Sequence, residues 1–454
     1  MRRRFRFVTR SWMLLLGMTV AAWSGLSLPS GYAAGSRPSP PKLPAKELLR
    51  RIDRGPVVLS RVTVVGDVVL KRVVAQPFTC TECVFTGAFR ARNASFRQRI
   101  NVAGSRFGGR VDLGGSRFER EVFFGSHGRG KPSTYERGVN FSLASFDDRV
   151  DFTGARFRFA DFSDARFRGE ASFADVTGDG NCRFDGADFA GLASFHRALF
   201  DSTVTFVRAE FHRRADFRLA VFDGPADFAV ASFTDATFAT ARFAARPRPP
   251  KEPGLILAEV DASGSLDFSS AEFVGPIDAF GMTADALVLN PHQAANHVFG
   301  PQVSDVLELI ESSAKDKQNF SLANDAFYER QIILSHHYSA VQRALDVVFY
   351  RTVAGYLVRP QRPLLILVVL VWALAVIRTL RARRPYRLRS MPALSRDLFQ
   401  RAERSFLTAF RWRSEIPTGM NRLEVFTYRL LLICALIGLY ADPTFRQIFE
   451  FLRG

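Results

Sequence analysis

Phenylalanine returns at a nearly fixed interval through the middle of the chain. Steps of five and six residues alternate for much of the stretch from 141 to 243. A small residue stands two positions before most of these Phe, as in Ala155-Arg156-Phe157. The repeating Phe stand at positions 141, 146, 152, 157, 162, 167, 173, 184, 189, 195, 200, 206, 211, 217, 222, 228, 233, 238 and 243. The same interval reaches back through Phe96, Val102, Phe107, Leu113, Phe118 and Phe124.

This interval fits neither the period of about 3.6 of a helix nor the period of 2 of a long strand. It suits a chain that makes a short extended step, turns a corner and repeats, with four steps to a coil and coils stacked about 4.8 Å apart. Each Phe then points inward and stacks on the Phe of the next coil. The small residue two positions earlier also points inward. Intervening residues face solvent, among them Arg156, Asp161, Arg166 and Asp188.

The segments Asp151-Phe152-Thr153-Gly154-Ala155-Arg156-Phe157 and Ala160-Asp161-Phe162-Ser163-Asp164-Ala165-Arg166-Phe167 carry a family resemblance. The sequence resembles pentapeptide-repeat proteins, in the Phe-centred variant with alternating five- and six-residue steps. The resemblance covers roughly residues 78–290. It implies an all-β fold, a right-handed quadrilateral β-helix, which we place over 57–290. Because six-residue steps depart from the strict five, we expect less regular corners.

Two interruptions of the repeat are predicted to be loops that leave the coils. They span residues 125–139 and 246–253, and the second is rich in proline. Beyond it, Leu266-Asp267-Phe268 and Ala271-Glu272-Phe273 resume the pattern for a final coil or two. Loops on a rigid scaffold are frequent binding sites. Tolerated insertions are the simpler interpretation.

The N-terminus has the pattern of a secretory signal. Residues 1–10 contain five Arg, residues 12–28 are apolar and uncharged, and small residues follow at 31–35. We predict a signal peptide over 1–34, cleaved near Ala33 or Ala34. An uncleaved anchor is the alternative. The prolines from Pro38 to Pro44 predict an extended linker over 35–56.

After the repeat, the hydrophobic period becomes helical. Val303, Val306, Leu307, Ile310 and Ala314 form one apolar helix face. A second helical stretch is predicted from Asp325 to Tyr350. Together these make a juxtamembrane helical region over 301–360.

Two apolar runs near the C-terminus predict membrane-spanning helices over 363–380 and 425–441. The segment between them, 381–424, holds 11 Arg against 4 Asp and Glu. Positive charge favours the cytoplasmic side, so this basic loop is predicted to be cytoplasmic and the repeat extracytoplasmic. A short tail follows over 442–454. The expected location is the cell membrane, with more than one pass.

The stretches Ala323-Asn324-Asp325-Ala326-Phe327-Tyr328-Glu329-Arg330 and Gly355-Tyr356-Leu357-Val358-Arg359-Pro360 carry a second resemblance. They resemble the link between the repeats and a two-helix, channel-like domain in some membrane members of the family. Those members carry a glycine-rich selectivity filter, whose nearest counterpart here is Ile416-Pro417-Thr418-Gly419. A ring of backbone carbonyls needs the missing glycines. The resemblance therefore implies two membrane helices but not ion conduction.

The charge distribution points to a membrane rather than to nucleic acid. The net charge is +18, but residues 78–244 hold 23 Lys and Arg against 21 Asp and Glu. The excess lies in the first ten residues, in 37–77 and after residue 377. Basic charge beside apolar runs is typical of membrane topology, so we expect no nucleic-acid partner.

The four cysteines and seven histidines supply little chemistry. Cys80 and Cys83 form a C-x-x-C pair, for which a redox pair, a disulfide or half a zinc site are the functional interpretations. The repeat places both of them, and Cys182, at inward positions, which favours core packing. His196 and His212 follow centre Phe and should point outward, His292 and His297 lie just beyond the repeat, and His336-His337 lies in a helical stretch.

We expect no catalytic, cofactor-binding or metal-binding residues and no cofactor. The leading hypothesis is a non-enzymatic, membrane-anchored protein that displays a β-helical rod outside the cytoplasm for partner binding or scaffolding. A channel-like or transport-associated membrane protein is the alternative. A DNA-mimic inhibitor of a topoisomerase is a lesser alternative, because that role needs a strongly acidic rod.

Overall fold

The structure is a computed structural model that describes four stretches of the chain and a few single helical positions after them. The stretches are residues 40–70, 73–126, 131–245 and 253–345. Several predicted segments lie wholly or almost wholly outside the described residues: the signal peptide over 1–34, the tip of the second loop, the membrane helices over 363–380 and 425–441, the basic loop over 381–424 and the tail over 442–454.

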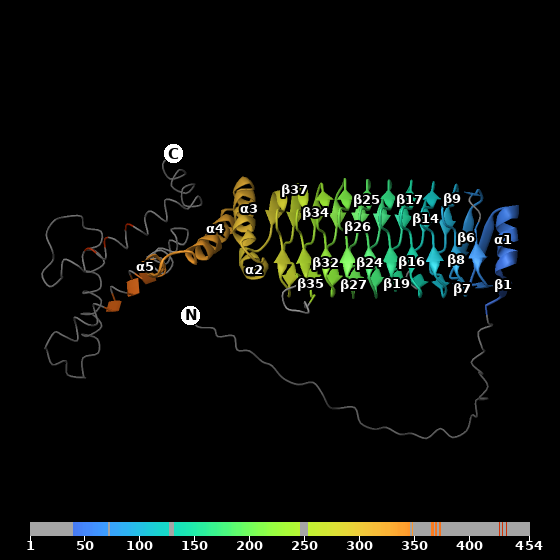
Figure 1. Cartoon of the computed structure of the whole chain (residues 1–454), viewed down its shortest axis with the longest axis horizontal. Coiled ribbons are helices and arrows are strands. Elements are labelled where there is room, and N and C mark those ends of the chain that lie inside the picture. The colour runs from blue at the N-terminus through green and yellow to red at the C-terminus, as the bar shows by residue number, and fades with distance from the viewer. Residues whose placement is uncertain are drawn as a thin grey trace, which may run out of the picture. The chain divides into compact units, whose positions relative to one another are not determined.

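The described chain from residue 57 to residue 290 is a β-solenoid, which confirms the expected class of fold (Figure 1). Short parallel strands stack along its length in four ladders. The first ladder is β1 (Lys42–Pro44), β3 (Thr63–Val65), β7 (Val84–Phe85), β11 (Arg106–Phe107), β15 (Thr134–Tyr135), β19 (Arg156–Phe157), β23 (Thr177–Gly178), β27 (Leu199–Phe200), β31 (Val221–Phe222), β35 (Arg242–Phe243) and β38 (Glu272–Phe273).

The second ladder is β4 (Val68–Val69), β8 (Phe89–Arg90), β12 (Val111–Asp112), β16 (Val139–Asn140), β20 (Ala160–Asp161), β24 (Cys182–Arg183), β28 (Val204–Thr205), β32 (Ala226–Asp227), β36 (Leu255–Ile256) and β39 (Ile277–Asp278). The third is β5 (Val73–Val74), β9 (Ser95–Phe96), β13 (Arg117–Phe118), β17 (Ser145–Phe146), β21 (Arg166–Phe167), β25 (Asp188–Phe189), β29 (Glu210–Phe211) and β33 (Ser232–Phe233).

The fourth ladder is β2 (Val57–Ser60), β6 (Phe78–Thr81), β10 (Ile100–Asn101), β14 (Val122–Phe123), β18 (Val150–Asp151), β22 (Ala171–Ser172), β26 (Ala193–Ser194), β30 (Ala215–Asp216) and β34 (Ala236–Thr237). Two longer strands, β37 (Asp261–Asp267) and β40 (Thr283–Val288), close the coils. β37 pairs with both β33 and β34, so it bridges the third and fourth ladders.

The alternation of five- and six-residue steps corresponds to two kinds of corner. At most five-residue corners one residue adopts positive φ, as Leu143 (φ 59°) does between Phe141 and Phe146. A six-residue corner has one residue more, as between Phe146 and Phe152. One coil is therefore 22 residues long where Val84 stacks on Arg106. The six-residue steps do not disorder the corners, although the alternation lapses from Phe152 to Phe167, where three five-residue steps follow one another.

The Phe ladder fills the interior as predicted, and every Phe of the repeat is buried. Rings of successive coils stack face to face: the centroids of Phe189 and Phe211 are 4.7 Å apart with an interplanar angle of 1°. Rings from adjacent ladders meet edge to face, as Phe195 and Phe206 do at 5.2 Å. Stacked and edge-to-face arrangements are both favourable for aromatic rings.

The predicted loop over 125–139 is shorter than expected, because Tyr135 occupies a centre position of the ladder. Its ring stacks on Phe107 at 5.0 Å, and its hydroxyl donates to the carbonyl of Phe124. Ser133, two positions earlier, fills the small inward position and is fully buried. Residues 133–139 of the predicted loop therefore belong to the solenoid. Burial raises the pKa of the Tyr135 hydroxyl above its usual range.

One centre position of the coils between residues 131 and 245 is occupied by glycine and has no side chain. Gly178 pairs with Phe157 in the coil before it and with Phe200 in the coil after it. A Cβ built on Gly178 would lie 2.7 Å from Sγ of Cys182 and 3.1 Å from the ring of Phe200. Cys182 and the neighbouring rings therefore fill the space that a Phe occupies in other coils.

The aspartates that precede many centre Phe hold the corners. Oδ1 of Asp161 accepts the N–H of Ser163 at 3.0 Å, and Oδ1 of Asp227 accepts the N–H of Ala229 at 2.9 Å. A short acidic side chain thus bonds the backbone two residues ahead, in the manner of an Asx turn. Asp161, predicted to face solvent, does point outward, but it also stabilises the turn.

A helix covers the N-terminal end of the solenoid, which corrects the predicted linker over 35–56. α1 (Ala45–Arg54) follows β1 directly, and its buried face is formed by Ala45, Leu48 and Ile52. These three residues join the same core as the first coils. The prolines before residue 45 suggested an extended segment, but the spacing of Leu48 and Ile52 is that of an amphipathic helix.

Three helices cover the other end of the solenoid (Figure 1). α2 (Pro291–His297) begins at Asn290, whose side chain accepts the N–H groups of His292 and Gln293. α3 (Gln302–Asp316) packs against β40 and buries the predicted face, Val303, Val306, Leu307, Ile310 and Ala314. α4 (Phe320–Ser335) packs against α2 and α3. We call α2, α3 and α4 the helical cap.

The helix predicted from Asp325 to Tyr350 is broken. α4 ends at Ser335 and α5 (Ala340–Leu345) follows, so His336 and His337 lie in the turn between them rather than in a helix. Within the part of the chain that the structure describes, no helix is long and apolar enough to cross a membrane.

Candidate interaction surface

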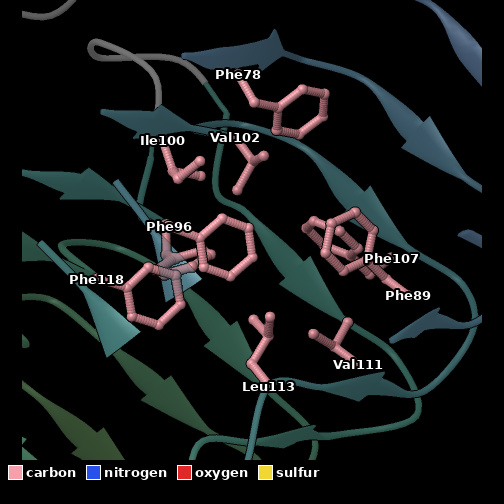
Figure 2. A pocket seen from close by; sticks show the side chains of 10 residues that line it. Phe78, Phe89, Phe96, Ile100, Val102, Phe107, Val111, Leu113 and Phe118 are labelled. Carbon is pink, nitrogen blue, oxygen red and sulfur yellow. The ribbon is translucent and has the colours of Figure 1, made fainter. Parts of the chain in front are cut away.

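Among the described residues, side chains fill the interior of the solenoid. The void in Figure 2 has a volume of ≈ 10 Å³ and is lined only by apolar side chains where Val102 and Leu113 replace Phe in the ladder. A second void of ≈ 10 Å³ lies near Leu255, Met282 and Val306 at the helical cap. Spaces of this size and polarity remain empty. Any binding by the solenoid must therefore use its outer surface.

Cys80 and Cys83 form a disulfide within one coil, with their Cα atoms 5.7 Å apart. Both are buried, so the prediction of inward positions is confirmed, but the preference for simple core packing over a disulfide is wrong. The hydroxyl of Ser105 donates to the carbonyl of Cys80 and accepts the N–H of Cys83. This bond from the next coil holds the turn that brings the two sulfur atoms together.

Cys182 is a free, buried thiol at an inward position, as predicted. Burial raises the pKa of this thiol to about 12. At neutral pH it is protonated and has little nucleophilic character. Its role is to pack beside Gly178.

The histidines gain partners that the linear sequence does not show. Nε2 of His212 lies 3.1 Å from Oδ1 of Asp188 and 3.4 Å from Glu210, on the outside of the third ladder. His292 of α2 lies 3.6 Å from Glu329 of α4. Stacking of coils and packing of helices bring these carboxylates close. Among the described residues, no group of three His, Cys, Asp or Glu side chains is arranged to hold a metal ion.

The first loop is tied back onto the solenoid. Nζ of Lys131 lies 3.2 Å from Oε2 of Glu82, which also receives Arg61 at 3.1 Å. The hydrogen bonds from Arg61 and Lys131 hold the pKa of the Glu82 carboxyl below its usual range. The loop base thus has a defined position on the outer surface.

The five-residue corners expose several large apolar side chains. Leu143, Leu219 and Val230 are each close to half exposed or more, and each adopts positive φ. For a bulky or β-branched residue this conformation is unusual and unfavourable. These corners run along the edges of the solenoid and give it apolar contact points between polar faces.

A patch of paired charges lies on the fourth ladder. The guanidinium of Arg218 donates to both oxygens of Asp216, at 2.9 and 2.7 Å. Partial burial of Asp216 opposes its ionisation, but the side-chain and backbone hydrogen bonds from Arg218 prevail and hold its pKa below the usual range. His196 lies nearby and adds a smaller effect of the same sign.

The stretch Ala323 to Arg330, which resembles a link to a membrane domain, forms the inner face of α4. Ala323 and Ala326 are buried, and such small side chains let α4 approach α3 closely. Arg330 reaches Glu308 at 3.0 Å and Glu311 at 3.6 Å, both on α3. Lys315 also pairs with Glu311. The stretch from Ala323 to Arg330 thus holds α4 against the rest of the helical cap.

Comparison with known families supports the repeat assignment for part of the chain. Residues 136–177 match the family model for pentapeptide repeats. Comparisons with curated proteins and with solved structures gave no significant match. The matched segment lies within a Phe ladder that continues through many more coils on both sides. The chain thus contains pentapeptide repeats, and they form part of a Phe-rich β-solenoid.

Proposed function

We propose that this protein is a non-enzymatic, membrane-anchored scaffold that displays its solenoid outside the cytoplasm and binds a protein partner there. The Cys80–Cys83 disulfide is the observation that supports a location outside the cytoplasm. Disulfides persist in oxidising compartments and are rare in the reducing cytosol. The filled interior leaves the corners and faces of the solenoid as the surface for recognition.

Membrane anchoring rests on the C-terminal part. Leu365, Val368, Val369 and Trp372 are helical, are spaced as one helix face, and are exposed by 62%, 42%, 65% and 43%. An exposed apolar helix face of this kind suits contact with lipid or with another membrane helix. We further propose two membrane helices, over 363–380 and 425–441, and a right-handed quadrilateral solenoid.

A cysteine-accessibility experiment on the full chain tests this topology. In intact cells, a membrane-impermeant maleimide is expected to label Leu143→Cys, which is exposed on a solenoid corner. It should label Ser405→Cys, in the basic loop, only after the membrane is permeabilised. Cys182 is buried and serves as an internal background control. Labelling of Ser405→Cys but not Leu143→Cys in intact cells would overturn the proposal.

A further inference from the structure

The first coil of the solenoid differs on its outside from every coil that follows. Val58, Val65, Val69 and Val73 are exposed by 80%, 45%, 53% and 49%. They belong to β2, β3, β4 and β5, so the first full coil places one exposed valine on each of the four ladders. We call these four residues the valine girdle.

The girdle ends after one coil. By register, Val58 is followed by Thr79, Val69 by Arg90 and Val73 by Ser95. These later positions carry polar or charged side chains, as expected for the solvent-facing side of a solenoid. An apolar residue at one such position is unremarkable on a protein surface. Four of them around a single terminal coil form a local apolar band.

The helix beside the girdle is basic on its outer side. The apolar face of α1 is turned into the core, which leaves Lys46, Arg50, Arg51 and Arg54 exposed. Over residues 40–70 the chain has six Lys and Arg against three Asp and Glu. Glu47 pairs with both Arg50 and Arg51 and neutralises part of this charge.

The chain before α1 has the composition of a segment that is targeted to a membrane or inserted into one. Residues 1–10 contain five Arg, and residues 12–28 are apolar and uncharged. The solenoid therefore begins shortly after a segment that targets or enters a bilayer. Cleaved or retained, that segment delivers the girdle and α1 to a membrane surface.

We propose that the N-terminal end of the solenoid docks on the surface of an anionic lipid bilayer. The basic side chains of α1 contact lipid phosphates, and the valine girdle lies at the boundary between headgroups and acyl chains. Electrostatic attraction combined with shallow burial of apolar side chains is the usual basis of interfacial binding. A nucleic acid would satisfy the arginines but would leave the four valines in water.

This contact goes beyond the C-terminal anchoring proposed above and does not depend on it. Because the four valines lie on four different ladders, the girdle meets the bilayer as a whole only when the solenoid stands end-on. That orientation keeps the corner at Leu143, on a central coil, away from the lipid.

The test uses the full chain, with Cys434→Ser to remove a competing thiol, reconstituted into lipid nanodiscs. An environment-sensitive fluorophore is attached at Val58→Cys, and nitroxide-labelled lipid serves as the quencher. Strong quenching is expected in discs that contain phosphatidylglycerol, and weak quenching in discs of phosphatidylcholine alone. The matched control, Leu143→Cys, is exposed on a central coil and should remain unquenched in both.

A charge variant separates docking from simple tethering. Replacing Arg50, Arg51 and Arg54 with Gln should weaken docking about 100-fold, because each basic residue near an anionic surface contributes about fivefold to the affinity. The control variant replaces Arg208, Arg213 and Arg214 with Gln and should dock as the unmodified chain does. Circular dichroism checks that both variants melt at similar temperatures.

Two results would overturn the docking proposal. One is the absence of quenching of the Val58→Cys probe in anionic discs. This result would count against docking even if the chain associated end to end with a second copy. The other is equal quenching in both lipids and in both charge variants, which would show tethering alone. Neither result bears on which side of the membrane the solenoid occupies, so failure of docking is distinguishable from failure of the proposed topology.

Discussion

Two regions of the solenoid, the N-terminal coils (residues 57–126) and the central coils (residues 131–245), differ in where they depart from the repeat. The N-terminal coils depart from it in the interior, and the central coils depart from it at the outer corners. The N-terminal interior is mixed. Phe89 occupies an inward position that is usually small, Ala91 follows at a position that is usually Phe, and Val102 and Leu113 replace Phe in the ladder. The cystine and the void of Figure 2 belong to this part.

The central interior is almost uniform, with Phe at the centres and mostly Ala or Val at the small positions. Its irregularities lie outside, at the corners. Val230 and Thr240 hold φ of 59° and 57°, whereas the described left-handed corners of the N-terminal coils carry glycine, as at Gly104 and Gly115, or the polar residues Arg61, Glu82 and Asn93. A side chain in the left-handed region costs roughly 1–2 kcal/mol. The difference indicates that a regular aromatic core tolerates bulky or β-branched residues at left-handed corners, whereas the mixed core is combined with glycine or polar residues there.

Removal of one central ring should have the largest effect. Phe195 is fully buried and stacks on Phe173 at 5.0 Å and on Phe217 at 4.8 Å. Phe195→Ala is expected to destabilise the surrounding coils by about 3–5 kcal/mol. Leu113→Ala, beside an existing void, should cost less. Hydrogen exchange of the strand amides measures the loss of stability in each variant. An equal loss in Phe195→Ala and Leu113→Ala would contradict the difference between the two interiors.

The missing ring at Gly178 offers a test of packing within the central coils. Gly178→Ala places a methyl group 2.7 Å from Sγ of Cys182 and should destabilise the chain by about 1–3 kcal/mol. Cys182→Ala makes room for that methyl group. The double variant is therefore expected to be more stable than Gly178→Ala alone, as measured by urea unfolding. Additive losses would show that the two residues are not coupled.

Removal of the cystine should affect only the N-terminal coils. For so short a loop, the chain-entropy estimate gives about 2 kcal/mol of stabilisation. Replacing both Cys80 and Cys83 with Ala, or adding a reductant, should increase hydrogen exchange in β6, β7 and β10 and leave β26 and β30 unchanged. Cys182→Ala provides the control, because its response to reductant should match that of the unmodified chain. An equal increase in hydrogen exchange along the whole solenoid would show that the disulfide does not act on the N-terminal coils alone.

Relief of one corner should give the smallest effect, with the opposite sign. Val230→Gly removes a β-branched residue from positive φ and should stabilise the chain by up to about 1 kcal/mol, after the added flexibility of the unfolded chain is counted. Val221→Gly, at an ordinary strand position on the outside of β31, should destabilise it. Thermal unfolding of the two variants, compared side by side, decides whether the corner is strained.

The register of the Phe ladder made most of the solenoid predictable. A period of five to six fixed which side chains face inward, including Cys182, and placed His212 outside. The period failed at Tyr135, because the residues inserted between β14 and β15 interrupt the interval of five to six. The small inward residue Ser133 and the ring of Tyr135 nevertheless follow the pattern of the repeat. A search that allowed Tyr at centre positions would have found it.

Contacts between coils and between helices were beyond prediction from a linear pattern. His212 meets Asp188 only because successive coils stack, and Arg330 meets Glu311 only because α4 folds back on α3. α1 was missed because proline content outweighed the spacing of Leu48 and Ile52. The Cys80–Cys83 bond was underestimated, since inward burial and disulfide formation are compatible when both thiols face the same lumen.

The closed ends have a consequence for assembly. A parallel β-solenoid that stopped abruptly would present unpaired backbone N–H and C=O groups to any other copy, and such edges template fibre growth. α1 covers one terminus, and at the other α3 packs on β40, where Ser313 accepts the N–H of Leu287. The caps therefore act as terminators of strand addition. Loss of either cap should convert a protein of fixed length into one that polymerises along its own axis.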